Sequence, residues 1–415
     1  MAVDLRVNLG GVALNNPLVI ASSDLGCHLG AIKEAEGYGA GAFITKGCIS
    51  RPDAVGLKRK PRHRVDLKKM TISGHSGSRR LSLEQAESLI SRAKKEVKIP
   101  VGANLFVFNP GEEEKYFVTR AAERIYRSGA DFIELDCTGN LPVHFGETGE
   151  TNVTGESFAD EAGAQYLGFI FEVVRSVKNV VGVPVMAKVA YENINVPVLV
   201  QAMTRGGADI IDIGNAAVGL APGMIDVYHP EKKLGGFVSA SKSTMLNLFG
   251  EPLRAVAQGY LVRTAKLLRT PILACGGITS WQHVVEGIMC GATATAACTI
   301  YMLRGFEVLR KMESGLRKFM EEQGYATLDE FRGVILDRVA LNFAEIEVRD
   351  AVARIDPAKC NGCGLCLKPG HCGLERRAIT MAGGKAVVEE AQCVGCETCA
   401  SICPTGAVAI ILTAG

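Results

Sequence analysis

Short apolar runs alternate with longer, charged and alanine-rich segments along residues 10–305. The short runs have the length and β-branched composition of buried strands, and the longer segments carry apolar residues at the spacing of amphipathic helices. Most helical segments end in a glycine just before Ala-Asp or Ala-Thr, as a helix C-cap does. The strand-like runs are PLVIAS from residue 17, AFITKG from 42, PVGANLF from 100, DFIELD from 131, PVMAKV from 184, DIIDIGN from 209, PILACGG from 271 and TATAAC from 293.

Repeated strand–helix units of this kind predict a parallel (β/α)8 TIM barrel, which is an α/β fold. An open doubly wound sheet is the alternative, but the chain lacks the GxGxxG fingerprint that such a sheet carries after its first strand when it binds a dinucleotide. Amphipathic patterns over 306–324 and 327–339 predict a terminal barrel helix and a second, capping helix.

The last sixty residues contain two cysteine runs, the second of which ends in Cys-Pro. Three thiolates from one tight loop and a fourth from elsewhere in the fold suit a [4Fe–4S] cubane, and the second run has the spacing of bacterial ferredoxins. In two-cluster ferredoxins the fourth cysteine of each run binds the other cluster. We therefore predict one cluster on Cys360, Cys363, Cys366 and Cys403, and another on Cys393, Cys396, Cys399 and Cys372. Two structural zinc sites are the alternative for paired CxxC motifs.

The cysteine runs complete the predicted domain organisation. We expect a (β/α)8 barrel over residues 1–345 and a small α+β ferredoxin domain with two [4Fe–4S] clusters over residues 346–415. Between the two ligand runs, residues 378–390 predict a β-hairpin.

Composition narrows the class of protein only slightly. The net charge of +2 gives no strong field for nucleic acid, and a hydrophobic content of 47% suffices for a large core. Six of the 14 cysteines lie outside the two runs without disulfide-like spacing. Iron–sulfur thiolates favour a reducing compartment, so we expect the cytoplasm. We see no signal peptide at the N-terminus and no apolar stretch long enough to span a membrane.

Polar residues gather where the predicted barrel strands end, which is where such barrels have their active sites. They include Ser22, Lys46, Asn104, Lys188 and Asn215. A lysine inside a barrel needs an anionic partner. A flavin ring gathers negative charge on reduction, and a carboxamide can both donate to and accept from its imide edge.

The last two strands add a predicted anion site. Gly276 and Gly277 open a helix, so their backbone N–H groups and the helix N-terminus can hold a phosphate, and Cys298 and Thr299 offer a second set of N–H groups. Ordinary turn glycines are the alternative, but phosphate binding after strands seven and eight recurs in these barrels. Together with the lysines, the two loops favour FMN as the cofactor.

Over nearly its whole length the sequence resembles the dihydroorotate dehydrogenase superfamily and, within it, the FMN/iron–sulfur subunits of bacterial dihydropyrimidine dehydrogenases. The resemblance is carried by NNPLVIASSDLG, GAFITKG, PVMAKV, ACGGITSWQHVVEGIMCGAT and the eight-cysteine tail. It implies that Lys46 lies near the pyrimidine edge of the flavin and that Lys188 contacts the flavin. It also implies that Asn104 contacts the flavin or the substrate and that Asn215 faces the substrate. The implied FMN-binding residues are Ala21, Ser22, Lys46, Asn104, Lys188, Asn215, Gly250, Gly276, Gly277, Cys298 and Thr299.

The sequence departs from the resembled family after the fourth predicted strand. Members that act on pyrimidines carry E-x-N-x-S-C-P, with the cysteine as acid/base, whereas Gly139 occupies that position here. Since the reaction needs a proton carrier opposite the flavin, we considered Cys137 and His144 with Lys46 as catalytic residues, and also His75, Glu147 and Glu150. Arg79 and Arg80 are candidates for binding an anionic group of the substrate. The alternative is that they lie in solvent at the start of a helix.

These features predict an FMN- and iron–sulfur-dependent oxidoreductase acting on a C–C bond next to a carbonyl in a small cyclic or conjugated substrate. The missing cysteine argues against a standard pyrimidine. The alternatives are an electron-transfer subunit with a degenerate barrel and a dihydropyrimidine dehydrogenase subunit with a relocated acid. By the resemblance, the electron partner is an NAD(P)H-oxidising flavoprotein subunit or a free ferredoxin, and the chain is a homo-oligomer; we expect no partner among nucleic acids or membranes.

Overall fold

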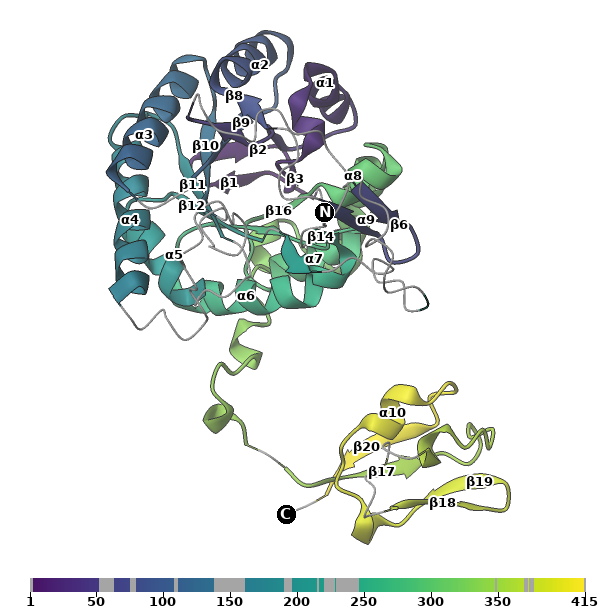
Figure 1. Cartoon of the computed structure of the whole chain (residues 1–415). Helices are drawn as coiled ribbons and strands as arrows, with labels where there is room; N and C mark the ends of the chain where they lie inside the picture. Colours follow the sequence, from purple (N-terminus) through teal and green to yellow (C-terminus); the bar gives the residue numbers. More distant parts are fainter. Residues whose placement is uncertain are drawn as a thin grey trace. The chain divides into compact units, whose positions relative to one another are not determined.

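The computed structural model describes residues 3–51, 63–74, 80–107, 111–137, 161–189, 196–214, 216–219, 228, 246–347, 349–368, 372 and 377–413. They form two compact units, Met1–Val339 and Ala340–Gly415 (Figure 1). This division falls near the predicted boundary, and the cofactors assigned to the two domains stay a prediction. None of the described helices is both long and apolar enough to cross a membrane.

The first unit contains the predicted barrel, which is confirmed. Its parallel strands pair in chain order, and the last pairs with the first, so the sheet closes (Figure 1). The barrel strands are β3 (Leu18–Ile20), β4 (Ala42–Ile44), β9 (Val101–Phe106), β10 (Phe132–Asp136), β11 (Val185–Val189), β12 (Ile210–Ile213), β15 (Ile272–Cys275) and β16 (Ala294–Ala297).

Amphipathic helices surround the barrel and bury their apolar faces against it. Helix α2 begins with a capping box, in which Ser82 and Gln85 each bond the other's backbone N–H. The helices are α1 (Leu29–Gly37), α2 (Leu83–Glu96), α3 (Glu112–Arg127), α4 (Glu161–Lys178), α5 (Val196–Arg205), α6 (Arg254–Leu267), α7 (Trp281–Met289), α8 (Thr299–Arg304) and α9 (Val308–Gln323).

The predicted helix over 327–339 is wrong. The chain there forms two short 3-10 turns, η6 (Leu328–Glu330) and η7 (Leu336–Arg338). Gly333 between them has a φ of +72°, and its N–H donates to the carbonyl of Ile288 in helix α7. A residue in the left-handed region whose N–H donates to another helix interrupts the α-helix. The amphipathic side-chain pattern continues through it, which is why the sequence predicted one helix.

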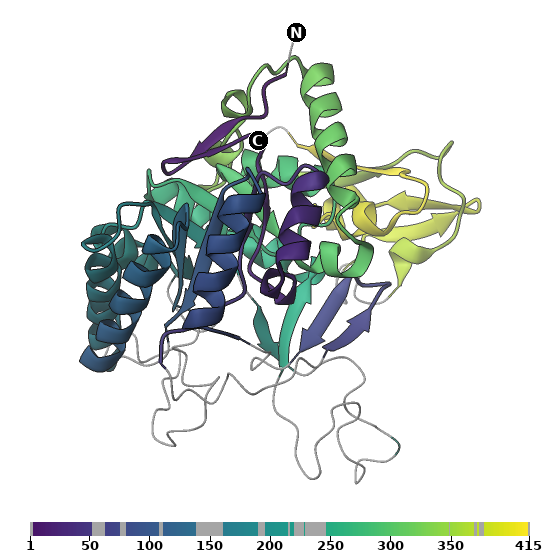
Figure 2. The same ribbon diagram turned by 90° about the horizontal axis from the view of Figure 1, so that it is seen from above.

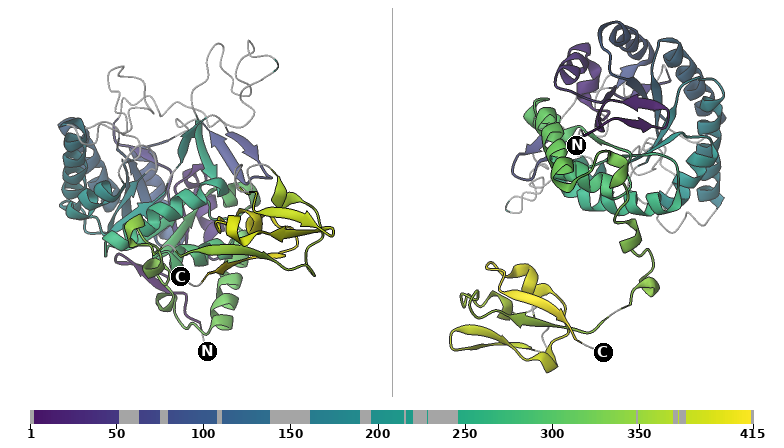
Figure 3. Two further views of the ribbon diagram at one scale, coloured as in Figure 1. Left: turned by 90° about the horizontal axis from the view of Figure 1, so that it is seen from below. Right: turned by 180° about the vertical axis from the view of Figure 1, so that it is seen from behind.

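Small β-elements cover both ends of the barrel. The hairpin of β1 (Val7–Leu9) and β2 (Val12–Leu14) lies across the N-terminal end, where Gly10 approaches the backbone of Asp209 (Figure 3, right). At the C-terminal end, an antiparallel sheet in the order β13 (Ala217–Gly219), β14 (Leu246–Gly250), β7 (Thr71–Gly74) and β6 (His63–Asp66) forms what we call the mouth sheet (Figure 2). Beside it, β5 (Cys48–Ile49) pairs with both β9 and β8 (Leu81–Ser82).

The second unit is a small α+β domain with the ferredoxin-like pattern. Strand β17 (Ala351–Ile355) pairs with β20 (Val408–Leu412). Strands β18 (Ile379–Ala382) and β19 (Lys385–Val388) form the hairpin predicted between the cysteine runs, which is confirmed. A short helix, α10 (Thr398–Ile402), follows the second run. Its apolar core is small, so bound clusters would supply much of the interior.

Candidate active site

One pocket opens at the carboxyl ends of the barrel strands, between β3, β11, β15, β16 and the mouth-sheet strand β14. It brings together most of the residues that the sequence assigned to FMN. The predicted residues in its lining are Ala21, Ser22, Lys188, Gly250, Gly276, Gly277, Cys298 and Thr299. Phe249, Leu253, Cys275 and Ile278 complete the wall. Residues that are distant in sequence therefore share one site.

The β15 side of the pocket fits a phosphate. Gly276 and Gly277 have φ angles of +118° and +74°, which side-chain-bearing residues rarely adopt. A Cβ on Gly277 would lie 2.6 Å from the Cβ of Arg254, so the loop has no room for a side chain. The glycines leave the backbone accessible just before helix α7, whose N-cap Ser280 accepts from the His283 N–H. Exposed backbone N–H groups before a helix suit an anion, so this part of the pocket fits the phosphate of FMN.

Lys188 forms the opposite side of the pocket and joins a buried polar cluster inside the barrel. Its Nζ donates to Asp212 Oδ2 at 2.7 Å and lies 3.6 Å from Glu134 Oε1. The side chains of Glu134 and Asp212 are 0% exposed and that of Lys188 is 4% exposed. Strand register explains the grouping, because Lys188 on β11 lies opposite Asp212 on β12. The pocket therefore faces a compensated ion pair.

Burial and the neighbouring charges shift the pKa values of Lys188 and Glu134. Burial acts to lower the pKa of Lys188, but the charges of Asp212 and Glu134 outweigh it and raise that pKa well above its usual value. Burial is also the main cause that raises the pKa of Glu134, to about 8, against the opposing charge of Lys188. Near neutral pH the cluster thus holds an ammonium on Lys188 and a carboxylic acid on Glu134.

Asn104 extends the buried cluster towards the mouth. Its Nδ2 donates to Glu134 Oε2 and, at 3.4 Å, to Asp136 Oδ2. Asn104 is fully buried, and its Oδ1 has no hydrogen-bond partner in the structure. An unsatisfied buried amide oxygen is costly, so Asn104 retains an acceptor for a bound molecule. The flavin or substrate contact predicted for it stays a prediction.

Lys46 lies at the rim and forms a second ionic group, which the sequence did not indicate. Its Nζ is 2.9 Å from Asp24 Oδ1, and His63 Nε2 is 2.7 Å from Asp24 Oδ2. Burial acts to raise the pKa of Asp24, but the hydrogen bond with His63 and the charge of Lys46 outweigh it and lower that pKa to about 2. Asp24 is therefore ionised at any working pH.

Cys137, the first candidate proton donor, lies in the barrel wall. Its side chain is 1% exposed and belongs to the main apolar core, away from the pocket lining. Burial, aided by the charge of Asp136, raises the pKa of its thiol far above the usual value. A buried neutral thiol is poorly suited to proton transfer, so this placement argues against the prediction.

Several predicted residues lie outside the part of the chain that the structure describes, namely His75, Arg79, His144, Glu147, Glu150 and Asn215. Arg80 is described, and its guanidinium lies 3.5 Å from the ring centre of Phe106. Sequence reasoning overlooked Asp24, His63, Glu134 and Asp212. The signal for two of them was present: Glu134 and Asp212 are charged residues inside otherwise apolar strand runs.

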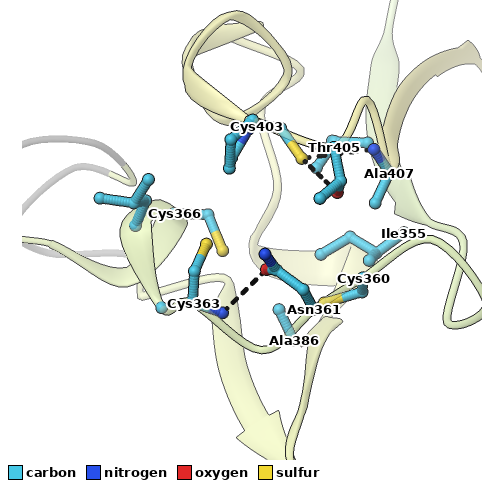
Figure 4. A pocket seen from close by; sticks show the side chains of 13 residues that line it. Ile355, Cys360, Asn361, Cys363, Cys366, Ala386, Cys403, Thr405 and Ala407 are labelled. Carbon is cyan, nitrogen blue, oxygen red and sulfur yellow. Dashed lines mark hydrogen bonds between the residues drawn. The ribbon is translucent and has the colours of Figure 1, made fainter.

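In the second unit, four cysteines surround one pocket (Figure 4). They are Cys360, Cys363, Cys366 and Cys403, which form the first predicted ligand set. The Ala407 N–H donates to Cys403 Sγ at 3.3 Å. Hydrogen bonding from Thr405 and nearby backbone N–H groups lowers the pKa of Cys403 to about 7, which favours the thiolate that iron binds. These residues fit a [4Fe–4S] cluster.

The second predicted set consists of Cys372, Cys393, Cys396 and Cys399. Cys393 Sγ accepts from the Ala353 N–H at 3.3 Å, and Cys399 is buried. Within the described ranges, no three Cys, His, Asp or Glu side chains are grouped as a single metal ion would require. A cubane holds its four thiolates farther apart than one ion does, and the assignment of this second set stays a prediction.

Comparisons with known proteins agree with this architecture. The family model described as "Dihydroorotate dehydrogenase" matches residues 163–320, and "4Fe-4S binding domain" matches residues 386–409. The chain is 26% identical over 340 residues to the catalytic subunit of dihydroorotate dehydrogenase B (NAD(+)) of Pyrococcus furiosus, covering 80% of this chain and 99% of that protein. It is 26% identical over 374 residues to the NAD-dependent dihydropyrimidine dehydrogenase subunit PreA of Escherichia coli K12, covering 88% and 84%.

Proposed function

Since the chain is a relative of the dihydroorotate dehydrogenase superfamily with an iron–sulfur domain, we propose that it uses FMN and two [4Fe–4S] clusters to reduce or oxidise a C–C bond next to a carbonyl. Its class is that of the flavin-dependent oxidoreductases acting on CH–CH groups. The finer part of the proposal concerns the substrate, which we take to be a small cyclic or conjugated carbonyl compound.

One observation supports the proposal above others: the pocket at the carboxyl ends of the strands gathers the glycine loop, Ser22, Lys188 and Thr299 in one lining. When bound, FMN supplies hydride transfer between its N5 and a substrate carbon. Gly276, Gly277 and Thr299 would hold the phosphate, and Lys188 would lie beside the ring. The Asp212 carboxylate keeps Lys188 charged and fixes its position.

The substrate differs from a standard pyrimidine in this proposal. Gly139 cannot provide the acid/base side chain that the resembled pyrimidine enzymes carry at this position, and the buried Cys137 thiol is no substitute for it. Lys46 at the rim would polarise the carbonyl of a bound molecule. A dihydropyrimidine dehydrogenase subunit with a relocated acid is the second candidate, favoured by the match to subunit PreA.

Electrons would pass between an external partner, the clusters and FMN. An NAD(P)H-oxidising flavoprotein subunit or a ferredoxin suits this role, because one-electron centres lie on the path. We further propose that the chain forms homo-oligomers and works in the cytoplasm, where thiolate-bound clusters and free cysteines persist.

The test uses the full chain purified without oxygen. Dithionite should bleach its flavin absorbance, and adding uracil or 2-cyclohexen-1-one to the reduced protein, free of excess dithionite, should restore it for at least one of the two. Faster recovery with the enone supports the first candidate, and faster recovery with uracil supports the second. Cluster absorbance without any bound flavin would contradict both and would support an electron-transfer subunit with a degenerate barrel.

A further inference from the structure

We propose that His63, held by Asp24, is the acid/base residue that exchanges a proton with the substrate at the mouth of the barrel. The inference rests on the proposed function, which requires a proton carrier and leaves that role open. His63 belongs to the mouth sheet, in a segment that the sequence analysis did not connect with the site.

His63 is not in the pocket lining, but its partner Asp24 follows that lining closely along the chain. Asp24 lies in the 3-10 turn η1 (Asp24–Cys27) directly after β3, two residues beyond Ser22 of the pocket lining. His63 Nε2 is 2.7 Å from Asp24 Oδ2, so the imidazole is tied to this rim. Strand β14 of the same mouth sheet supplies Phe249 and Gly250 to the lining. Strand β7 lies between β6 and β14, and His63 is opposite Gly74, which pairs with Asn247. The contact with Asp24 is therefore the closer link between His63 and the pocket.

The surroundings of His63 suit proton transfer. Its side chain is 26% exposed, enough for contact with a small molecule and with water. Asp24 faces it from η1 and Lys46 faces Asp24 from the end of β4. Across the sheet His63 is opposite Gly74 of β7, which carries no charge. A carboxylate on one ring nitrogen orients an imidazole, as in acid/base dyads generally.

The reaction balances with this residue in place. In the reducing direction, the substrate double bond is replaced by two C–H bonds: one carbon receives a hydride with both electrons, and its neighbour receives a proton from the imidazolium. FMN, reduced by the external donor through the clusters, would supply the two electrons, and water would return the proton to the imidazole. In the oxidising direction the neutral imidazole removes the proton from the same carbon.

Other described groups near the pocket are less suited to this role. Burial raises the pKa of Cys275 and of Cys298, both in the lining, above the usual range of a thiol. His283 receives a hydrogen bond at Nδ1 from the Thr279 N–H at 3.2 Å, and burial lowers its pKa. Lys188 is committed to its buried ion pair.

The first experiment compares His63→Gln with the wild-type chain, using His28→Gln as a matched control because His28 is exposed on the adjacent segment. His63→Gln should keep its FMN and its reduction by dithionite. Reoxidation of its flavin by uracil or 2-cyclohexen-1-one, whichever the wild type accepts, should slow by about 100-fold or more and lose the pH dependence that an imidazole confers. Added imidazole should restore part of the rate, and His28→Gln should match the wild type.

A second readout needs no turnover. Diethyl pyrocarbonate should modify both His63 and His28 in the oxidised wild-type protein, as located by mass spectrometry, and the accepted probe at saturation should protect His63 alone. A His63→Gln protein with the wild-type rate and pH profile, or a His63 that the probe leaves unprotected, would overturn this inference while the proposed function stands. A wild-type chain without flavin, or one that neither probe reoxidises, would overturn both.

Discussion

Lys188 shows how burial and partner charges decide what a single side chain offers to a cofactor. The sequence predicted a lysine near the flavin, and the pocket lining contains it. Its acidic partners, Glu134 and Asp212, were not predicted, because they precede the strand ends on which the sequence reading concentrated. Their effect is to compensate the ammonium, so the pocket faces a balanced cluster.

This balance predicts how the flavin potential responds to substitution. Asp212→Asn alone should change it little, because Glu134 lies 3.6 Å from Lys188 and would ionise in its place. Asp212→Asn combined with Glu134→Gln leaves the ammonium uncompensated and should raise the two-electron potential by roughly 30 mV, about 1.4 kcal/mol.

Lys188→Ala should lower the potential or weaken FMN retention. The measurement is an anaerobic spectroscopic titration, and equal potentials in all variants would contradict the proposed position of Lys188.

Glu134 predicts a pH dependence of stability. Its pKa is raised to about 8 in the folded protein, so the folded state holds a proton that the unfolded state has lost above its usual pKa near 4.5. Stability should therefore fall as the pH rises from about 5 to 8, by roughly 2–4 kcal/mol, since each pKa unit corresponds to about 1.4 kcal/mol. Glu134→Gln removes this decrease.

Unfolding can be followed by the fluorescence of Trp281, the sole tryptophan, which lies in barrel helix α7. Glu322→Gln on the exposed face of α9 is the matched control, because its ion pair with Lys318 is exposed. An identical pH profile for Glu134→Gln and the wild type would show that Glu134 is ionised in the folded barrel.

Among the structural elements, the loop between β15 and α7 carries the most specific part of the cofactor site. Its proposed role follows from glycines that precede a helix after a late barrel strand, where phosphate sites recur in such barrels. The mouth sheet could not be predicted in the same way. Its strands are short, and β6 and β14 are far apart in sequence, so no local pattern shows their pairing through β7.

Gly277→Ala tests the phosphate loop. An alanine at a φ of +74° costs about 1–2 kcal/mol, and its Cβ would lie 2.6 Å from that of Arg254. The FMN affinity, measured by fluorescence quenching on titrating deflavinated protein, should fall about tenfold or more. Gly259→Ala on the exposed surface of α6 meets no atom within 4 Å, so it should leave FMN affinity unchanged and stabilise the helix by up to about 1 kcal/mol. Unchanged affinity in Gly277→Ala would argue against this loop as the phosphate site.

For the whole molecule, the chain folds into two compact units, between which the proposed redox centres would be divided. The barrel and the ferredoxin domain were predictable, because strand–helix repeats and cysteine spacing are strong signals. The proton carrier was not, because it depends on which loops meet at the mouth. His63 and Asp24 are 39 residues apart and meet only in the folded chain.

In the predicted ligand sets, the fourth cysteine of each run binds the cluster of the other run. This assignment predicts how much iron each cysteine substitution removes. Cys403→Ala should lower the iron content from about eight to about four per chain. Adding Cys360→Ala should remove no more, because both side chains face one pocket. Combining Cys403→Ala with Cys393→Ala should remove nearly all iron. Cys290→Ala in the barrel is the control and should keep the full content, and further iron loss in the Cys360→Ala, Cys403→Ala protein would contradict the assignment.

The most direct test of the central claim is the cofactor content of the full chain after purification without oxygen. The account predicts about one FMN in the barrel, with about eight iron and eight labile sulfide atoms in the tail domain. A folded chain that binds neither FMN nor iron under these conditions would contradict it.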